Sequence, residues 1–182
     1  MNDLREWFPM RVTYSRELQV KSALDTLGIE CFLPMKNKLV TIGSHRHYLL
    51  VPAIHNLIFV RSTQDKLTEM KNTRRELSSL RYMTQPINHG TREAKHVIMR
   101  VPDAQMENFM RVATITDDRV MFLDYVDAKS ILGRKVRIID GDFAGVDGVV
   151  VRIQKNKRVV VHLEGLAAVA IAFVPPSFLA YK

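Results

Sequence analysis

Residues 131–161 read ILGRKVRIIDGDFAGVDGVVVRIQKNKRVVV, and this stretch decides the fold of the C-terminal part of the chain. Apolar residues alternate with charged ones from Val136 to Ile138, and a second alternating run begins at Val149. Period-two patterns of this kind indicate β-strands. Between the runs lie residues without a Cβ, which permit a tight loop: Gly141, Gly145 and Gly148. The stretch therefore predicts two strands joined by a glycine-rich loop that also contains Phe143.

The residues after this stretch continue the β pattern. Val159 to Leu163 alternates again, and the segment from Leu166 to Ala172 places large residues between alanines. Alanine is the best helix former, so a helix is the alternative for this second segment. The strict alternation through Val169, Ile171 and Phe173 favours a strand. We therefore expect residues 131–182 to form a small β-barrel.

The N-terminal part mixes helices and strands. Strands are expected at Trp7 to Val12, Ile29 to Pro34 and Leu57 to Val60, because these runs are apolar and short. A first helix is expected to be capped by Ser15 and to end at Gly28. A second is expected to be capped by Asp65, and a third to follow Pro102. The fold class is therefore α+β, an α/β sandwich with an antiparallel sheet and helices followed by a β-barrel.

The segment from 117 to 130 contains four aspartates and reads as a linker. We therefore predict domains at residues 1–116 and 131–182, with residues 117–130 between them. Residues 120–126 are apolar enough to dock on either neighbour.

Composition narrows the function classes. The 182 residues hold a single cysteine, Cys31, so no internal disulfide forms, which favours a cytoplasmic protein. No apolar run approaches the roughly 20 residues of a membrane span, and the N-terminus lacks the apolar run of a signal peptide. The formal net charge of +8 favours an acidic partner such as nucleic acid.

The glycine pattern around Phe143 resembles a KOW motif, in particular the C-terminal SH3-like barrel of NusG-like transcription elongation factors. Asp142 stands where that motif usually has proline. Residues 7–8 (Trp-Phe), 32–34 (Phe-Leu-Pro) and 58–60 (Ile-Phe-Val) are similar to the N-terminal (NGN) domain of the same family. The resemblance covers almost the whole chain in the right domain order. It extends to specialised members, including antiterminators of capsular-polysaccharide operons.

The resemblance implies a non-enzymatic factor that binds the clamp helices of the largest RNA polymerase subunit and suppresses pausing or termination. Leu57 and Phe59 would belong to the apolar patch for the clamp helices, with Trp7 at its border or beneath it. The alternative for such strand residues is a core position. The family usually has Pro-Gly-Tyr where this chain has residues 55–57, His-Asn-Leu. Residues 64–70, with Gln64 and Thr68, match the position of the contact to the polymerase gate loop.

Basic residues are candidates for contacts with non-template DNA or nascent RNA. One group lies near the first helix: Arg11, Arg16 and Lys21. The other lies in the arm after the second strand: Lys36, Lys38, His45, Arg46 and His47. The alternative for each is a solvated surface. The resemblance also implies that the KOW domain docks a ribosomal protein or the termination factor Rho. In one branch of the family this domain refolds between helix and barrel, whereas the alternation here favours a stable barrel.

Other functions have little support in the sequence. His45, His47 and His55 match no metal site, and Cys31 lies within an apolar run as a buried, inert thiol would. We therefore expect no catalytic residue, no metal and no cofactor, and a monomer in solution. The competing function is an RNA- or ribosome-binding KOW module without polymerase contact.

Overall fold

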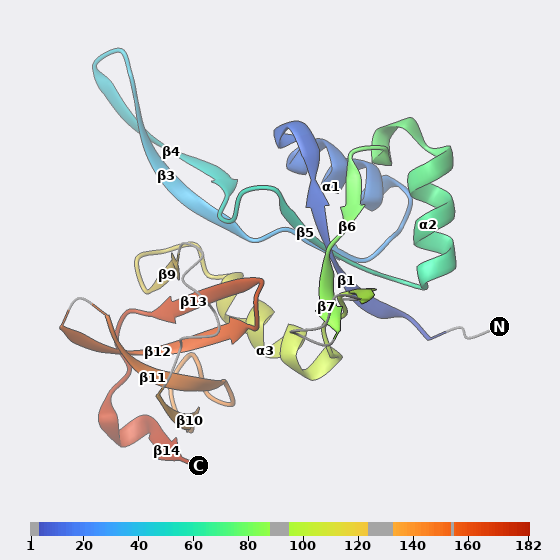
Figure 1. Cartoon of the computed structure of the whole chain (residues 1–182). Coiled ribbons are helices and arrows are strands. Elements are labelled where there is room, and N and C mark those ends of the chain that lie inside the picture. The colour runs from blue at the N-terminus through green and yellow to red at the C-terminus, as the bar shows by residue number, and fades with distance from the viewer. Residues whose placement is uncertain (1–3, 88–94, 124–132, 154) are drawn as a thin grey trace. The chain divides into compact units, whose positions relative to one another are not determined.

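The computed structural model describes residues 4–87, 95–123, 133–153 and 155–182 (Figure 1). The chain divides into two compact units. One contains the residues up to 33 and residues 55–103, and the other contains residues 34–54 and 104–182. The division differs from the predicted boundary after residue 116, because residues 34–54 and the third helix group with the C-terminal strands.

The first unit is built on a four-stranded antiparallel sheet in the order β2-β5-β1-β6. These strands are β2 (Cys31–Phe32), β5 (Leu57–Ser62), β1 (Glu6–Val12) and β6 (Leu80–Tyr82). The unit also contains η1 (Thr13–Ser15), α1 (Glu17–Thr26), α2 (Gln64–Thr73), η2 (Arg75–Leu77) and the hairpin β7 (Thr84–Ile87) with β8 (Lys95–Ile98). The two central strands β5 and β1 are almost entirely buried, so the core of this unit lies around them.

Two predicted helix caps are wrong, although both helices are present. The first helix has Arg16 at its N-cap and no side-chain cap, because Ser15 is inside the preceding 3-10 turn with φ of 50°. The second helix is capped by Thr63, whose hydroxyl accepts from the backbone N–H of Lys66 at 3.3 Å. Asp65 lies in the first turn instead. Gly28 ends the first helix with φ of 64°, as predicted.

The second unit contains a six-stranded antiparallel sheet in the order β14-β10-β11-β12-β13-β9. Its strands are β9 (Val120–Leu123), β10 (Arg134–Ile138), β11 (Asp147–Ile153), β12 (Asn156–Leu163), β13 (Ala167–Ile171) and β14 (Leu179–Tyr181). The short helix η4 (Pro176–Phe178) precedes β14. One face carries apolar side chains that are at most 2% exposed: Val136, Ile138, Val159, Val161, Val169 and Ile171. The opposite face of β12 and β13 carries a second buried cluster, Val160, Ala168 and Ala170, against which residues of β9 and β11 pack.

The alternating segment after Leu166 is a strand and not a helix, as predicted, but it ends at Ile171. Phe173 is therefore outside the strand and 72% exposed, so its predicted place in the alternation is wrong. Within the predicted linker, β9 pairs with β13 at the edge of the sheet, and residues 124–130 lie outside the described residues. The linker is thus part of the β structure over Val120–Leu123.

The second unit also contains a helix and a separate hairpin. Helix α3 (Asp103–Ala113) contacts the sheet through Asn108, whose side chain donates to the carbonyl of Asp147 and accepts from its N–H, at 2.7 and 2.8 Å. Strands β3 (Met35–Ile42) and β4 (His45–Pro52) form a two-stranded sheet of their own. Its turn contains Gly43 with φ of 62°.

Candidate functional site

The three apolar residues expected to contact polymerase lie on one face of the first sheet. Across β1 and β5, Trp7 faces Arg61, Pro9 faces Phe59, and Arg11 faces Leu57, so these alternate positions share a face. Trp7, Leu57 and Phe59 are 3%, 4% and 0% exposed. All three side chains are therefore buried in this structure, as the alternative of a core position also predicts. The predicted role of these residues in binding stays a prediction.

The turn before β5 is held by a buried carboxylate. Asn56 has φ of 60°, a conformation that glycine and asparagine tolerate best. Its N–H donates to Glu17 Oε1 at 2.7 Å, and His55 Nδ1 lies 3.4 Å from the same oxygen. The Asn56 carbonyl accepts from the N–H of Val12 at 3.0 Å. These bonds fix where β5 begins beside β1, with asparagine taking the backbone conformation that a glycine would adopt.

The two polar residues expected at the gate-loop contact are both tied to Tyr82. The Tyr82 hydroxyl lies 2.9 Å from the Thr68 hydroxyl and 3.1 Å from the Gln64 carbonyl oxygen. The Gln64 side chain accepts from Arg100 at 2.9 Å. Desolvation by burial raises the pKa of Tyr82 above its ordinary value. Gln64 and Thr68 are half-buried, so they present a fixed rather than a freely moving polar surface.

The basic residues near the first helix do not converge on one point. Arg11 lies directly across from Arg81 on neighbouring strands, and both are exposed, a like-charge pairing that an anion would relieve. Lys21 donates to Asp25 at 2.7 Å, and this hydrogen bond raises the pKa of Lys21. A phosphate would therefore have to compete with Asp25 for Lys21.

Arg16 belongs to a strained segment that the sequence did not indicate. Its guanidinium carbon lies 5.6 Å from the ring centre of Tyr14, which is 83% exposed. Tyr14 and Ser15 have φ of 64° and 50°, a left-handed conformation that costs such residues about 1 kcal/mol each. Tyrosine does not favour this conformation, so no sequence signal marks Tyr14. The segment presents an aromatic ring and a cation together at the surface.

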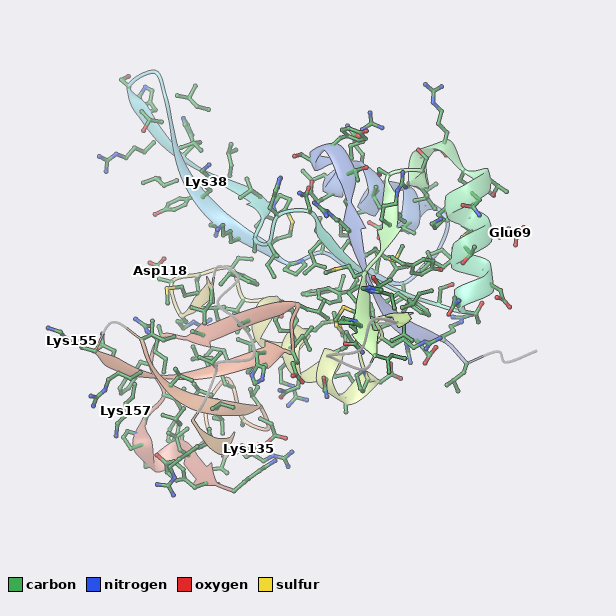
Figure 2. All side chains as sticks on the ribbon, viewed as in Figure 1. Lys38, Glu69, Asp118, Lys135, Lys155 and Lys157 are labelled. Atoms are coloured by element: carbon green, nitrogen blue, oxygen red, sulfur yellow. The ribbon has the colours of Figure 1, made fainter. Side chains whose placement is uncertain are left out.

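The basic residues of the arm lie on the hairpin β3–β4, but on two faces. Lys36 faces Val51, Lys38 faces Leu49, and these alternate pairs share one side of the hairpin. Arg46 faces Thr41 in the intervening register, so it lies on the other side. Figure 2 shows Lys38 on this hairpin. The basic residues of the arm, although close together in the sequence, are therefore divided between the two faces of the hairpin.

The loop between β10 and β11 contains the glycine motif. Gly141 and Gly145 have φ of 78° and 86°, so both need glycine, and Phe143 between them is buried at 8% exposure. A Cβ on Gly148 would lie 2.7 Å from Val159 Cγ1 and 2.9 Å from the Val160 carbonyl oxygen. The loop and the start of β11 therefore depend on these positions lacking a side chain.

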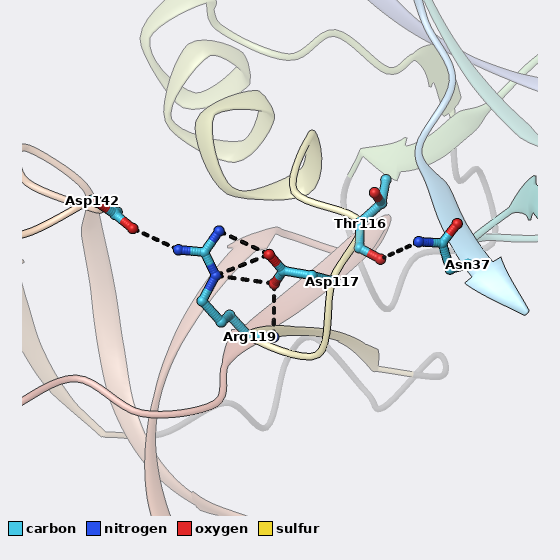
Figure 3. Close-up of polar contacts among 5 residues, drawn as sticks. All are labelled: Asn37, Thr116, Asp117, Arg119 and Asp142. Carbon is cyan, nitrogen blue, oxygen red and sulfur yellow. Dashed lines mark hydrogen bonds and ion pairs between the residues drawn. The ribbon is translucent and has the colours of Figure 1, made fainter. Parts of the chain in front are cut away.

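Arg119 ties the segment before β9 to this loop. Its guanidinium donates to Asp117 at 2.8–3.1 Å and to Asp142 at 2.5 Å (Figure 3). These hydrogen bonds raise the pKa of Arg119, and the bond from Arg119 lowers the pKa of Asp117. Asp142, where the KOW motif usually has proline, thus has a partner of its own. All three side chains are exposed, so we expect a modest contribution to stability.

Neither a metal site nor a membrane helix is found in the part of the chain that the structure describes. Its histidine, cysteine and acidic side chains form no group of three with metal-binding geometry. None of its helices has the length and apolar character that crossing a membrane requires. Burial raises the pKa of the Cys31 thiol to about 11, which opposes formation of a nucleophilic thiolate.

Two protein-family models match this chain, one in its N-terminal part and one in its C-terminal part. The family model described as transcription termination factor nusG matches residues 5–110, more than half of the chain. The chain belongs to the NusG family. A KOW motif matches residues 132–163, which contain β10, β11 and β12. No curated protein matches the chain. The predicted NusG-like assignment and α+β fold class are thus confirmed, with an N-terminal NusG domain and a C-terminal β-rich KOW region.

Proposed function

We propose that this NusG-type transcription factor binds bacterial RNA polymerase and suppresses pausing or termination, as a specialised antiterminator at particular operons. The observation that carries the proposal is the occurrence of both family matches in one chain, NusG at 5–110 followed by KOW at 132–163. On this proposal the chain is not an enzyme and acts in the cytoplasm as a monomer.

The proposed polymerase contact is the face of the first sheet with Trp7, Leu57 and Phe59. Strand β5 is apolar on both faces, since Ile58 and Val60 are also fully buried. On this proposal one face serves the core of the unit, and the other receives the clamp helices once its side chains become accessible. A factor that prefers the closed, elongating polymerase shifts the population toward that state through its higher affinity for it.

The remaining contacts of the proposal are polar. Gln64 and Thr68 at the start of α2 would face the gate loop, held in place by Tyr82. Arg11 and Arg16 would contact nucleic acid, and Lys21 would do so after leaving Asp25. The KOW region would recruit a ribosomal protein or Rho through surface residues such as Arg152, which is exposed.

The test is binding of the full chain to purified bacterial core RNA polymerase, measured by biolayer interferometry at low and high salt. Two alanine variants on neighbouring positions of β5 form a matched pair, Leu57→Ala and Ile58→Ala. Both remove a buried apolar side chain and are expected to cost about 2–5 kcal/mol of stability, so folding is checked by circular dichroism.

We expect saturable binding that changes little with salt, and a larger loss of affinity for Leu57→Ala than for Ile58→Ala. Equal losses would place the contact elsewhere on the chain. Failure of the chain to bind polymerase, together with salt-sensitive binding to ribosomal RNA, would replace the proposal by an RNA- or ribosome-binding KOW module.

A further inference from the structure

The hairpin β3–β4 is a free two-stranded ribbon with exposed side chains. Its pairing runs without a break from Met35 opposite Pro52 to Ile42 opposite His45 (Figure 1). Among residues 36–50 every residue except Val40 is exposed. An isolated two-stranded hairpin is at best marginally stable in water, so it adds little to the core of a protein. A ribbon of this length with both faces open is better suited to binding than to packing.

The charge of the ribbon points to a polyanionic partner. Residues 35–52 contain two lysines, one arginine and two histidines, and they contain no aspartate or glutamate. A segment that carries charges of one sign attracts nucleic acid through its phosphates. Large apolar side chains are exposed beside these charges: Leu39, Ile42, Tyr48, Leu49 and Leu50.

The two faces of the ribbon differ in composition. The register places four basic side chains on one face, which we call the basic face: Lys36, Lys38, His45 and His47. The rings of His45 and His47 lie 6.4 Å apart, as expected for alternate residues on one side of a strand. The opposite face carries Leu39, Tyr48, Leu50 and Arg46.

The opposite face of the ribbon is hydrogen-bonded at its root to the segment before β9. On the opposite face, the Asn37 side chain donates to the Thr116 carbonyl oxygen at 3.0 Å (Figure 3). Tyr48, also on that face, lines a cleft with residues 115–118 and 120–122, and Lys36 at the root of the basic face lines the same cleft. The cleft includes Asp117 and Asp118, whose negative charge disfavours a phosphate there.

We propose that the basic face of the β3–β4 ribbon binds double-stranded DNA by lying in its major groove. The major groove of B-form DNA is about 12 Å wide and admits a two-stranded β-ribbon. Eight residues per strand span about 27 Å at about 3.4 Å each. This length corresponds to about eight base pairs. The deep, narrow major groove of duplex RNA does not admit side chains in this way.

The residues of the basic face have distinct roles in this arrangement. Lys36 and Lys38 lie about 7 Å apart along one strand and contact successive phosphates. Ile42 and Leu49 lie on the same face and contact thymine methyl groups. The inference deepens the nucleic-acid contact of the proposed function. It is tested without polymerase, so its failure is distinct from a failure to bind polymerase.

The test is fluorescence anisotropy of a labelled 20-base-pair DNA duplex with the purified full chain over a series of salt concentrations. Lys38→Gln and Arg46→Gln form the matched pair, because each removes one positive charge from the same ribbon on opposite faces. The double variant Lys36→Gln/Lys38→Gln and a duplex RNA of the same sequence complete the set. Circular dichroism verifies that each variant is folded.

We expect Lys38→Gln to weaken DNA binding about five- to tenfold at 0.1 M salt and to reduce the salt slope by about 0.9. The double variant is expected to reduce the slope by about twice as much, whereas Arg46→Gln changes affinity less than about twofold. Equal effects of Lys38→Gln and Arg46→Gln would contradict the proposal that DNA binds to the basic face. Tighter binding to duplex RNA would overturn the DNA assignment. Undetectable DNA binding by a chain that still binds polymerase would overturn the inference and leave the ribbon as a protein contact.

Discussion

Asp147 and Arg137 face each other across strands β11 and β10 and are joined by two hydrogen bonds. Arg137 Nε and Nη2 donate to the two carboxylate oxygens at 2.9 and 2.7 Å, and Lys182 Nζ lies 2.7 Å from one of them. Arg137, as the main cause, holds the pKa of Asp147 at about 2, below its ordinary value of 3.8. In the KOW region, ion pairs to Asp147 of β11 thus join this strand to Arg137 of β10 and to Lys182.

This arrangement predicts acid sensitivity. Because the pKa of Asp147 is lower in the folded state, the contribution is complete above about pH 4 and is lost as the pH falls toward 2. Both side chains are solvent-exposed, so we expect a small contribution to the free energy of unfolding. Urea unfolding at pH 5 and pH 2.5 should show a smaller loss of stability for Asp147→Asn than for the wild type. Identical pH profiles for the two proteins would contradict the prediction.

Glu17 is expected to control the start of β5. The Glu17 side chain is 4% exposed and accepts from the Asn56 N–H at 2.7 Å, so removing it leaves a partly buried donor without its acceptor. We expect Glu17→Ala to reduce the free energy of unfolding by about 1–3 kcal/mol. Glu17→Gln keeps an acceptor oxygen and should recover part of this loss. Chemical denaturation measures the free energy of unfolding of both variants. Equal losses would show that the acceptor oxygen of residue 17 does not stabilise the fold.

Gly148 is expected to tolerate no side chain. A Cβ there would lie within 3 Å of Val159 and Val160, so Gly148→Ala should cost about 1–3 kcal/mol through overpacking in the KOW sheet. Gly165→Ala is the control, because open space surrounds that position and only its φ of 69° opposes alanine. Thermal unfolding should show a larger decrease in melting temperature for Gly148→Ala. The reverse order would argue against the packing described for β11 and β12.

Cys31 is expected to react slowly. Burial, followed by the charge of Asp25, raises the pKa of its thiol to about 11, so little thiolate is present at pH 8. Alkylation by iodoacetamide at pH 8 should be at least about tenfold slower for the folded chain than for the chain in urea. Equal rates in the two states would mean that the thiol is not protected.

The sequence predicted what local patterns determine. Alternation located the strands after residue 131, and spacing located the helices, because side-chain periodicity follows directly from backbone geometry. Helix caps were predicted less well, since Thr63 and Asp65 are both good capping residues and only the backbone path selects between them. The pairing of β9 with β13 joins residues far apart in sequence, and no local pattern indicates it.

The sequence predicted which residues are candidates for the site, but not how they are arranged in space. The basic residues of the arm were recognised, but their division between two faces depends on the register of β3 and β4. Likewise, an apolar strand was expected at Leu57 to Val60, whereas the burial of both of its faces depends on what packs against it. The strained Tyr14 left no trace in the sequence because tyrosine does not favour positive φ.

The most direct test of the central claim is a single-round transcription assay with purified bacterial RNA polymerase, with and without the full chain. We expect the chain to shorten the lifetime of pauses or to increase read-through of a terminator, and Leu57→Ala to reduce this effect more than Ile58→Ala. The chain is added at concentrations that saturate its binding to polymerase, on templates from the operons that it is proposed to serve. Unchanged pause lifetimes and unchanged read-through would then contradict the proposed function.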